Sequence, residues 1–275
     1  MSIAAYPGWP IRLEDLAGDN VIVFPTYAME WETGGDLRTA FAEVPLADYA
    51  FDLLGTRPAP RAASDESVRF VILGSDAQDA WRQYREMRGK LARIGRGRLW
   101  IRDAAGTRYW SYVRPLGLAS PTFGVENLRH FPVVLSFKRL SDWFAETESV
   151  ATLAGNGTYT VTATATVPVD DLRIEIAATA AGGYSSPSIE NIATGERFTV
   201  ARAGSTANHR LRIATAQWRA AESTDGGVSW TDVTEHLTVG PLQAVIIRLV
   251  PGTNTLAVTG CPAATVTIRW YDAFA

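Results

Sequence analysis

Short segments in which apolar and polar residues alternate predict a chain built largely of β-strands. In the first half, two of these segments flank Asp103–Gly106, which has the length and the glycine of a hairpin turn. Another segment alternates so that its apolar residues fall on one face of a strand. The strands predicted in this half are residues 21–24, 68–73, 98–102, 107–113 and 130–140.

One segment of the first half has helical periodicity instead. Apolar residues recur there at intervals of three and four, which predicts a helix with a single apolar stripe. Ser75 is expected to cap its N-terminus, with Gln78 completing a capping box, and Gly95 and Gly97 are expected to end the helix near residue 94. The residues of the stripe are Ala77, Ala80, Trp81, Tyr84, Met87 and Leu91.

The second half shows no helical pattern but a series of short alternating runs separated by Gly, Pro, Asn and Asp. Seven or more such strands predict a β-sandwich or jelly roll. The predicted strands are residues 159–167, 172–178, 197–201, 211–216, 245–250, 255–258 and 265–271.

A change in composition separates these halves, from an aromatic-rich and Arg-rich part to one rich in Thr, Ala, Val and Gly. We place the boundary between residues 145 and 152, which gives domains 1–148 and 149–275. The length of 275 residues also favours two domains. We therefore predict a mainly β protein, with an N-terminal β-sandwich flanked by one α-helix and a C-terminal β-sandwich.

The charge of the chain argues against a nucleic-acid-binding protein. The formal net charge is -3, and residues 1–145 carry 18 Lys and Arg against 17 Asp and Glu. Neither half has the basic excess that extensive phosphate contact needs, so we expect no specific nucleic acid partner. Cys261 is the only cysteine, and we expect no signal peptide, membrane span or anchor, and folding in a reducing cytoplasm.

Arginines on the predicted helix form a candidate basic contact face. Arg82, Arg85 and Arg88 lie beside the apolar stripe, within a longer basic stretch that only Glu86 opposes. Such residues either contact a neighbouring subunit or form a solvated face, and a path for DNA is the less favoured interpretation because the domain is almost neutral.

Candidate catalytic groups are few. The three histidines, His130, His209 and His236, are isolated in the sequence, and the chain has neither a nucleophile elbow nor a phosphate-binding loop. Asp170 and Asp171 would suit glycoside hydrolysis only across a cleft, and adjacent acids are more often a solvated turn. We expect no catalytic, cofactor-binding or metal-binding residues and no enzymatic activity, with a carboxylate-based glycosidase as an open alternative.

Residues 223–230 match the pattern S-x-D-x-G-x-x-W, the Asp-box of sialidases and other β-proteins. A single copy predicts a hairpin turn, in which Asp225 and Ser223 bond to local backbone and Trp230 packs beneath. Among the aromatic residues of this half, we expect Trp270 to lie in the core and Trp218 to be exposed. Trp218 is therefore a candidate contact for a glycan or a partner, and a carbohydrate-binding module stays open.

Taken in order, many weak motifs of this chain resemble the distal tail protein family of long-tailed phages, across essentially the whole sequence. The segments that carry the resemblance in the first half are residues 43–55, 75–101 and 131–144. Those in the second half are residues 156–158, 188–196, 211–213, 251–256 and 264–270. The segment around residues 217–234 is longer than the family pattern suggests, and the residues with which galectins bind lactose are not recognisable, so sugar binding does not follow from the resemblance.

The resemblance implies a tail-tube-like N-terminal domain and a galectin-like C-terminal domain. It also implies a structural protein of the virion, assembled in the host cytoplasm, whose copies form a hexameric ring at the tip of the phage tail. Its implied partners are the tail tube protein, the baseplate hub or a tail-associated fibre protein, and the tape measure protein. Ring contacts require two different complementary patches on each subunit.

An irregular segment between two predicted strands is a candidate for one such patch. Residues 54–66 hold two prolines and a polar cluster without periodicity, which predicts an extended loop or arm. We expect the arm to contact a neighbouring subunit or the tail tube. Its candidate contact residues are Leu54, Arg57, Pro58, Pro60 and Arg61.

Overall fold

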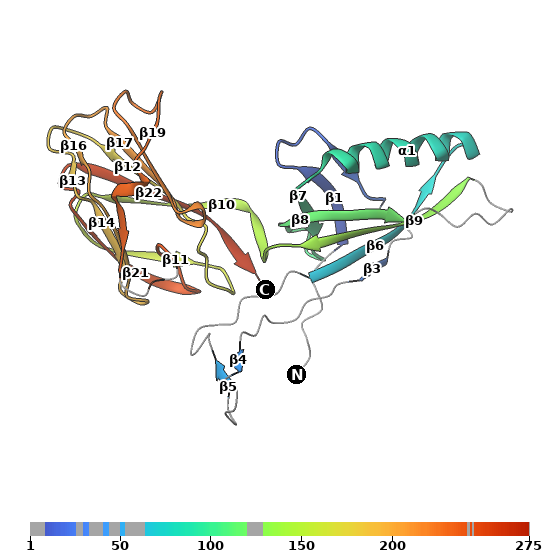
Figure 1. Cartoon of the computed structure of the whole chain (residues 1–275), viewed down its shortest axis with the longest axis horizontal. Coiled ribbons are helices and arrows are strands. Elements are labelled where there is room, and N and C mark those ends of the chain that lie inside the picture. Colours follow the sequence, from blue (N-terminus) through green and yellow to red (C-terminus); the bar gives the residue numbers. More distant parts are fainter. Residues whose placement is uncertain are drawn as a thin grey trace. The chain divides into compact units, whose positions relative to one another are not determined.

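A computed structural model shows a mainly β protein with one α-helix among the residues that it describes, which confirms the predicted fold class (Figure 1). The described residues are 9–25, 30–32, 41–43, 50–52, 64–119, 129–240, 243 and 245–274. The chain divides into two compact units, Met1–Trp143 and Phe144–Ala275. The division suggested by composition, at residues 148 and 149, lies slightly later, inside a strand that runs from Trp143 to Ala154.

Unit 1 contains an antiparallel sheet in the order β2-β1-β7-β8-β9-β6-β3. Its strands are β1 (Trp9–Asp15), β2 (Val21–Val23), β3 (Glu30–Glu32), β6 (Ser64–Leu73), β7 (Gly97–Arg102), β8 (Arg108–Ala119) and β9 (His130–Arg139), and β4 (Phe41–Glu43) pairs separately with β5 (Ala50–Asp52). The first half of β8 pairs with β7 and its second half with β9, and Val113 is paired with both neighbours. The long strand β8 therefore connects the two halves of this sheet.

Helix α1 (Ala77–Arg93) contacts β2, β6, β8 and β9 and lies along one face of the sheet in Figure 1. Ala80, Tyr84 and Leu91 of the predicted stripe are buried, whereas Trp81 is 36% exposed. The predicted cap at Ser75 is wrong by one residue. The carboxylate of Asp76 accepts the N–H of Asp79 at 2.8 Å, and Asp79 in turn accepts the N–H of Ser75 at 2.9 Å.

The end of the helix also differs in its cause from the prediction. Ile94 is the C-cap, in an extended conformation, and its side chain is buried. Gly95 is not in the left-handed conformation, so the helix ends because Ile94 enters the core and not through a glycine cap.

Residues 64–66 of the predicted arm belong to strand β6, which begins at Ser64 and not near Val68. Its early residues continue the pairing with β9, in which Glu66 lies opposite Phe137. The carboxylate of Glu66 is fully buried and forms an ion pair with the buried guanidinium of Arg139. Burial of this pair explains why a polar sequence without periodicity continues the strand.

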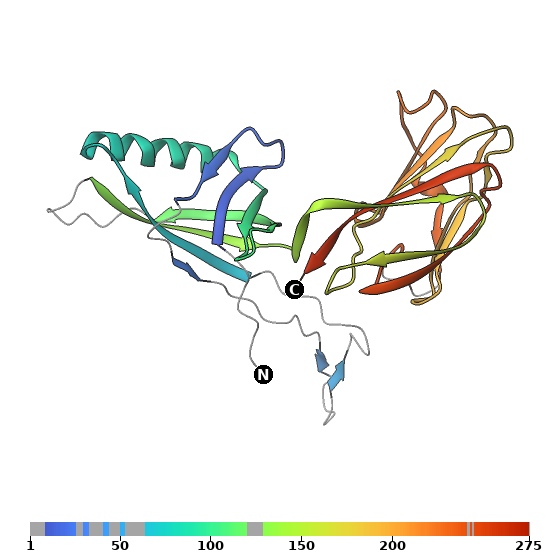
Figure 2. The same cartoon turned by 180° about the vertical axis from the view of Figure 1, so that it is seen from behind.

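Unit 2 is a sandwich of two antiparallel sheets, visible from both sides in Figures 1 and 2. The first sheet contains, in order, β19 (Thr231–Asp232), β18 (Arg219–Ser223), β17 (Arg210–Ala214), β12 (Arg173–Ala178), β22 (Ala264–Phe274) and β10 (Trp143–Ala154). The second contains, in order, β11 (Gly157–Ala163), β21 (Gly252–Thr259), β14 (Ser188–Asn191), β15 (Glu196–Val200) and β20 (Leu237–Val239). A separate pair joins β13 (Tyr184–Ser185) to β16 (Ala203–Gly204).

Strict alternation along these strands builds the core of unit 2. On β12, Ile174 and Ile176 are buried while Arg173 and Glu175 point to the outer face. The inward residues of both sheets form one apolar cluster, which includes Trp270 as predicted. The free thiol of Cys261 is also buried, and burial raises its pKa to about 11.

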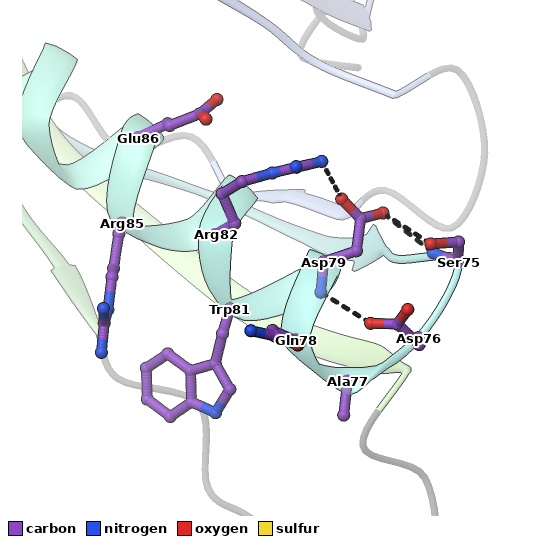
Figure 3. Close-up of a pocket in the computed structure, with 9 residues that line it drawn as sticks. All are labelled: Ser75, Asp76, Ala77, Gln78, Asp79, Trp81, Arg82, Arg85 and Glu86. Carbon is purple, nitrogen blue, oxygen red and sulfur yellow. Dashed lines mark hydrogen bonds and ion pairs between the residues drawn. The ribbon is translucent and has the colours of Figure 1, made fainter.

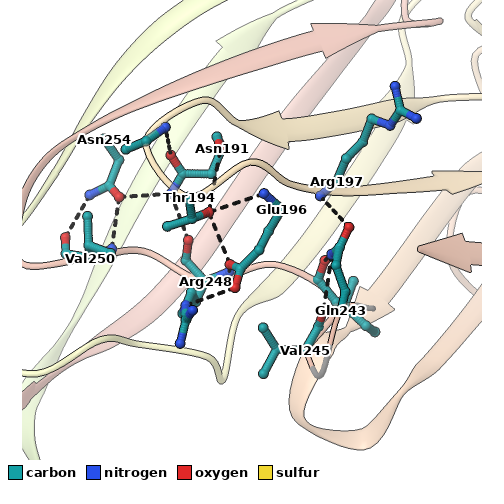
Figure 4. Close-up of polar contacts among 11 residues, drawn as sticks. Asn191, Thr194, Glu196, Arg197, Gln243, Val245, Arg248, Val250 and Asn254 are labelled. Atoms are coloured by element: carbon teal, nitrogen blue, oxygen red, sulfur yellow. Dashed lines mark hydrogen bonds and ion pairs between the residues drawn. The ribbon is translucent and has the colours of Figure 1, made fainter. Parts of the chain in front are cut away.

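The strand predicted at residues 245–250 is wrong. This segment makes only an isolated bridge, between Leu249 and Val169, although Ile246, Ile247 and Leu249 are buried. Side chains take the place of a neighbouring strand as partners of its backbone (Figure 4). The side chain of Gln243 donates to the carbonyls of Val245 and Ile246. Arg248 donates its backbone N–H to Glu196, and its carbonyl accepts from Asn191. The side chain of Asn254 binds both the N–H and the carbonyl of Val250.

Candidate interaction surfaces

The first candidate surface surrounds the N-terminal half of helix α1. A depression of about 850 Å³ is open to solvent there and is lined by residues 75–79, 81, 82, 85 and 86 (Figure 3). The ring of Trp81 packs edge-on against Phe131 with centroids 5.2 Å apart, so β9 holds the indole at the edge of the depression. The surface therefore combines a fixed aromatic ring with charged side chains of both signs.

The structure does not gather the candidate arginines into one basic face. Arg82 turns toward Asp79 and forms an ion pair with it, whereas Arg85 lies on the other side of Trp81, 6.0 Å from the ring centroid (Figure 3). Arg88 is exposed on the same helix outside the depression. Two of these arginines are thus already committed to neighbours on their own helix.

Acidic groups balance the charge of this depression. The backbone N–H of Ser75 lowers the pKa of Asp79 below its ordinary value, and the side chains of Gln83 and Arg82 lower it further. Asp76 and Glu86 also line the depression. Because three carboxylates face two arginines, the surface suits contact with a protein better than contact with phosphates.

The candidate arm residues Leu54, Arg57, Pro58, Pro60 and Arg61 lie outside the described residues. Their assignment as a contact stays a prediction. The described strand that follows them is paired along its whole length with β9.

Trp218 is exposed, as predicted, and its backbone has a positive φ of 52° at the end of the short helix η1 (Thr215–Gln217). The Asp-box forms the expected turn. The carboxylate of Asp225 accepts the N–H groups of Val228 and Ser229 at 2.9 and 3.0 Å, and the indole N–H of Trp230 donates to the carbonyl of Gly227 at 3.0 Å. The motif acts here as a local scaffold.

The groups considered for catalysis are dispersed. Asp170 is exposed, and the Nδ1 atom of His209 accepts the N–H of Ser205 at 2.8 Å. His236 lies 3.4 Å from the exposed carboxylate of its neighbour Glu235, and the side chain of His130 is outside the description. Within the described part of the chain, no three His, Cys, Asp or Glu residues are grouped so that they could hold a metal ion. No described helix is long and apolar enough to cross a membrane.

A second surface was missed in the sequence. On the outer face of the β18-β17-β12-β22 strands lies a groove of about 530 Å³, which we call the arginine groove. The residues that matter for its chemistry are Arg173, Glu175, Arg212, Arg219, Trp230 and Arg269. Arg210 and Arg212 alternate with buried Leu211 and Ile213, which signals an outward-facing arginine pair, but the other arginines come from strands far apart in the sequence.

Comparisons with known proteins support a relationship in fold. Neither a protein-family model nor a curated protein sequence matches the chain. Among solved structures, the Dit protein of phage SPP1 is 12% identical, with a TM-score of 0.61, and the match covers 90% of this chain and 93% of that protein. Its structure is described as a paradigm of the hub adsorption apparatus in phages that infect Gram-positive bacteria.

A second match is a chain in the baseplate of phage P2 in its activated conformation with Ca, at 7% identity and a TM-score of 0.50. It covers 97% of this chain and 99% of that one, and the Sr form gives a TM-score of 0.51. Both units take part in these matches, because nearly the whole chain is covered. The chain therefore has the fold of phage distal tail and baseplate proteins.

Proposed function

We propose that the protein is a structural, non-enzymatic subunit of the tail tip of a long-tailed phage. The observation that carries this proposal is the fold shared with the SPP1 Dit protein over nearly the full length of both chains. Similarity in one sandwich alone would carry little functional information, since sandwich folds serve many functions. A shared order of two different units over the whole chain is far more specific.

Within this role, we infer that six copies form a ring that connects the tail tube to the baseplate hub or to fibres. Unit 1 would supply the two complementary patches, one from the arm before Ser64 and one from the surface of α1. The tail tube protein and the tape measure protein are the expected partners above the ring. The ring would assemble in the host cytoplasm and remain in the virion.

The mass of the purified full-length protein in solution, measured by light scattering, tests this role. We expect six times the monomer mass of 29.9 kDa, and ring-shaped particles by negative-stain electron microscopy. A strict monomer at high concentration, together with failure to bind purified tail tubes, would contradict the proposal.

A deletion tests the contribution of the arm. Removal of residues 56–63 spares strand β6, which begins at Ser64, so the monomer should keep its fold. We expect the ring to dissociate to monomers while the circular dichroism spectrum stays unchanged. An intact ring in this variant would exclude the arm as a necessary contact.

A carbohydrate-binding adhesion module is the second candidate function, and the exposed indole of Trp218 is the observation that favours it. Exposed aromatic rings can stack on sugars, and this one lies outside the apolar core. A glycan array with the full-length protein, repeated with Trp218→Ala, tests this candidate. Binding that is lost in the variant would support a glycan-binding role, and no binding at millimolar glycan would exclude it.

A further inference from the structure

The arginine groove occupies a sheet face on which charge is segregated from the rest of unit 2. Residues 146–275 contain 8 Lys and Arg but 12 Asp and Glu. Five of those 8 basic residues are on the outer face of neighbouring strands, which leaves only 3 for the remainder of the segment. These five are Arg173, Arg210, Arg212, Arg219 and Arg269.

Two of the carboxylates on this face are each shared between two arginines. Glu148 pairs with both Arg173 and Arg269, and Glu175 with both Arg210 and Arg212, the latter two at 2.8 and 3.1 Å. Asp232 pairs with Arg219 at 2.9 Å. In these ion pairs, five guanidinium groups share three carboxylates.

The guanidinium groups are both exposed and held in place. The side chains of Arg212 and Arg219 are 54% and 64% exposed. Arg212 stacks 3.9 Å from the centroid of Trp230, and Arg173 lies 5.8 Å from that of Tyr271. Stacking fixes the plane of a guanidinium group, which prepares its N–H groups for a bidentate bond to a carboxylate.

The Asp-box supplies the fixed wall of this groove. The indole of Trp230 is anchored by its hydrogen bond to the carbonyl of Gly227, and Asp225 holds the loop through the N–H groups of Val228 and Ser229. The turn therefore places an aromatic ring against Arg212. This placement gives the motif a role in the surface as well as in the local fold.

The two contacts between arginines and aromatic rings restrict the class of ligand that this groove can bind. Glycans and single-stranded nucleic acids use aromatic rings as stacking platforms, but both rings here already have a guanidinium group against them. Arg219 on β18 and Arg269 on β22 lie on one row across the sheet, with Ala214 and Arg173 between them. They are three strand spacings apart, about 14 Å. Side chains four residues apart on an extended peptide are separated by about 13 Å, which matches two carboxylates to this pair.

We propose that the arginine groove is a docking site for an acidic, extended segment of another protein. Carboxylates at alternate positions of that segment would bind the exposed guanidinium groups of Arg212, Arg219 and Arg269. The proposal goes beyond ring formation, since it places a partner on unit 2.

A model peptide tests the site in the full-length protein. The probe is a fluorescein-labelled ten-residue peptide in which Glu alternates with Thr, and a peptide of Gln and Thr serves as the uncharged control. Fluorescence anisotropy should detect binding of the Glu peptide alone, and the affinity should fall as salt is added because the contacts are exposed charges. No binding of the Glu peptide at low salt overturns the proposal.

Substitutions locate the binding. The double variant Arg219→Gln, Arg269→Gln should bind the Glu peptide at least about tenfold more weakly, as expected for loss of two charged contacts. The matched control is Arg197→Gln, an exposed arginine on β15 of the opposite sheet, and it should change the affinity by less than about twofold. The control removes one charge where the double variant removes two, so a loss of about threefold or more in Arg197→Gln would mean that only net charge matters, which overturns the site.

Two further measurements separate other occupants. Inorganic polyphosphate that binds more tightly than the Glu peptide, with the same dependence on Arg219 and Arg269, would identify a phosphate polymer and overturn the proposal. A lower oligomer mass in the double variant would identify a second copy of this chain as the occupant, with the same consequence. We expect the double variant to keep the oligomer mass of the wild type and to lose binding of the Glu peptide.

Discussion

At the scale of single residues, the buried ion pair between Glu66 and Arg139 organises the middle of unit 1. The two side chains are 0% and 3% exposed. The indole N–H of Trp31 donates to Glu66 at 3.3 Å, and Arg139 donates to the carbonyl of Ser141 at 3.2 Å. The pair therefore connects β6 and β9 to β3 and to the carbonyl of Ser141, and its burial makes the loss of either partner costly.

Replacement of Arg139 by Leu should lower the free energy of unfolding by about 3–5 kcal/mol, because it leaves the carboxylate of Glu66 buried without its cation. Urea denaturation measures the loss. Lys138→Leu, at the neighbouring half-exposed position, should change the free energy of unfolding by less than about 1 kcal/mol. The double variant Glu66→Leu, Arg139→Leu should be more stable than Arg139→Leu, and the opposite order would show that the charge of Glu66 is not the cause.

Asp225 should make the stability of unit 2 depend on pH. Hydrogen bonds from the hydroxyls of Ser223 and Ser229 lower the pKa of Asp225 well below its ordinary value of 3.8. A carboxyl with a lowered pKa in the folded state stabilises it above its ordinary pKa, and this contribution is lost as the pH falls further. The Tm difference between the wild type and Asp225→Asn should therefore be larger at pH 6 than at pH 2.

The control for that pH series is Asp170→Asn, which removes one exposed carboxylate outside the Asp-box. Its Tm difference should not follow the same course. A constant difference between wild type and Asp225→Asn at every pH would show that the hydrogen bonds do not depend on the charge.

At the scale of elements, helix α1 shows which features a sequence can supply. Its apolar stripe predicted the helix, since one face must pack against the sheet. Its end near residue 94 was predicted from Gly95 and Gly97, and the position is right although buried Ile94 is the cause. The cap was misplaced because Ser75, Asp76 and Asp79 are all suitable capping residues, and the choice among them depends on where the chain leaves β6.

The position of the cap can be tested with two neighbouring alanine substitutions. Asp76→Ala should lower the free energy of unfolding by about 1 kcal/mol, because the N–H of Asp79 loses its acceptor. Ser75→Ala should have a smaller effect, since the hydroxyl of Ser75 makes only a 3.3 Å contact with Asp79. Equilibrium denaturation of both variants gives the order, and a larger loss for Ser75→Ala would restore the sequence-based cap.

Strands were harder to predict where tertiary contacts override the local pattern. The alternating hydrophobicity of residues 245–250 comes from side chains that fill the core, but their backbone bonds to Gln243, Glu196, Asn191 and Asn254 and not to a strand (Figure 4). Glu196 and Asn191 are distant in sequence from the backbone groups that they bind, whereas Gln243 and Asn254 lie within four residues of theirs. Strand β1 was missed for a related reason, because its pattern has no clear period and its pairing with β7 is interrupted by a bulge near Pro10.

At the scale of the whole molecule, the mainly β fold could be predicted from the periodicity of the chain, but the surfaces could not. The arginine groove combines residues from β12, β17, β18 and β22, whose adjacency follows from sheet order alone. On α1, by contrast, arginines that are close in sequence contact different neighbours: Arg82 pairs with Asp79, and Arg85 lies over Trp81. Sequence spacing identifies charged residues, whereas their grouping depends on the tertiary fold.

The triple variant Arg82→Glu, Arg85→Glu, Arg88→Glu tests what the helix surface contributes to assembly. The three arginine side chains are exposed, and the ion pair of Arg82 is with Asp79 on the same helix. The monomer should therefore keep its fold and nearly its Tm. If the surface contacts a neighbouring subunit, reversed charge should shift the ring toward monomers in light scattering. Triple substitution to Gln should cause a smaller shift.

Two results would contradict a subunit contact on α1. A ring that persists in the triple Glu variant means that the arginines form only a solvated face. If the triple Glu variant still forms the ring, but the wild type binds double-stranded DNA in a low-salt mobility assay and the variant does not, the result would instead support a path for DNA. We expect neither, because three carboxylates line the same depression and would repel phosphates, whereas a protein neighbour can match charges of both signs.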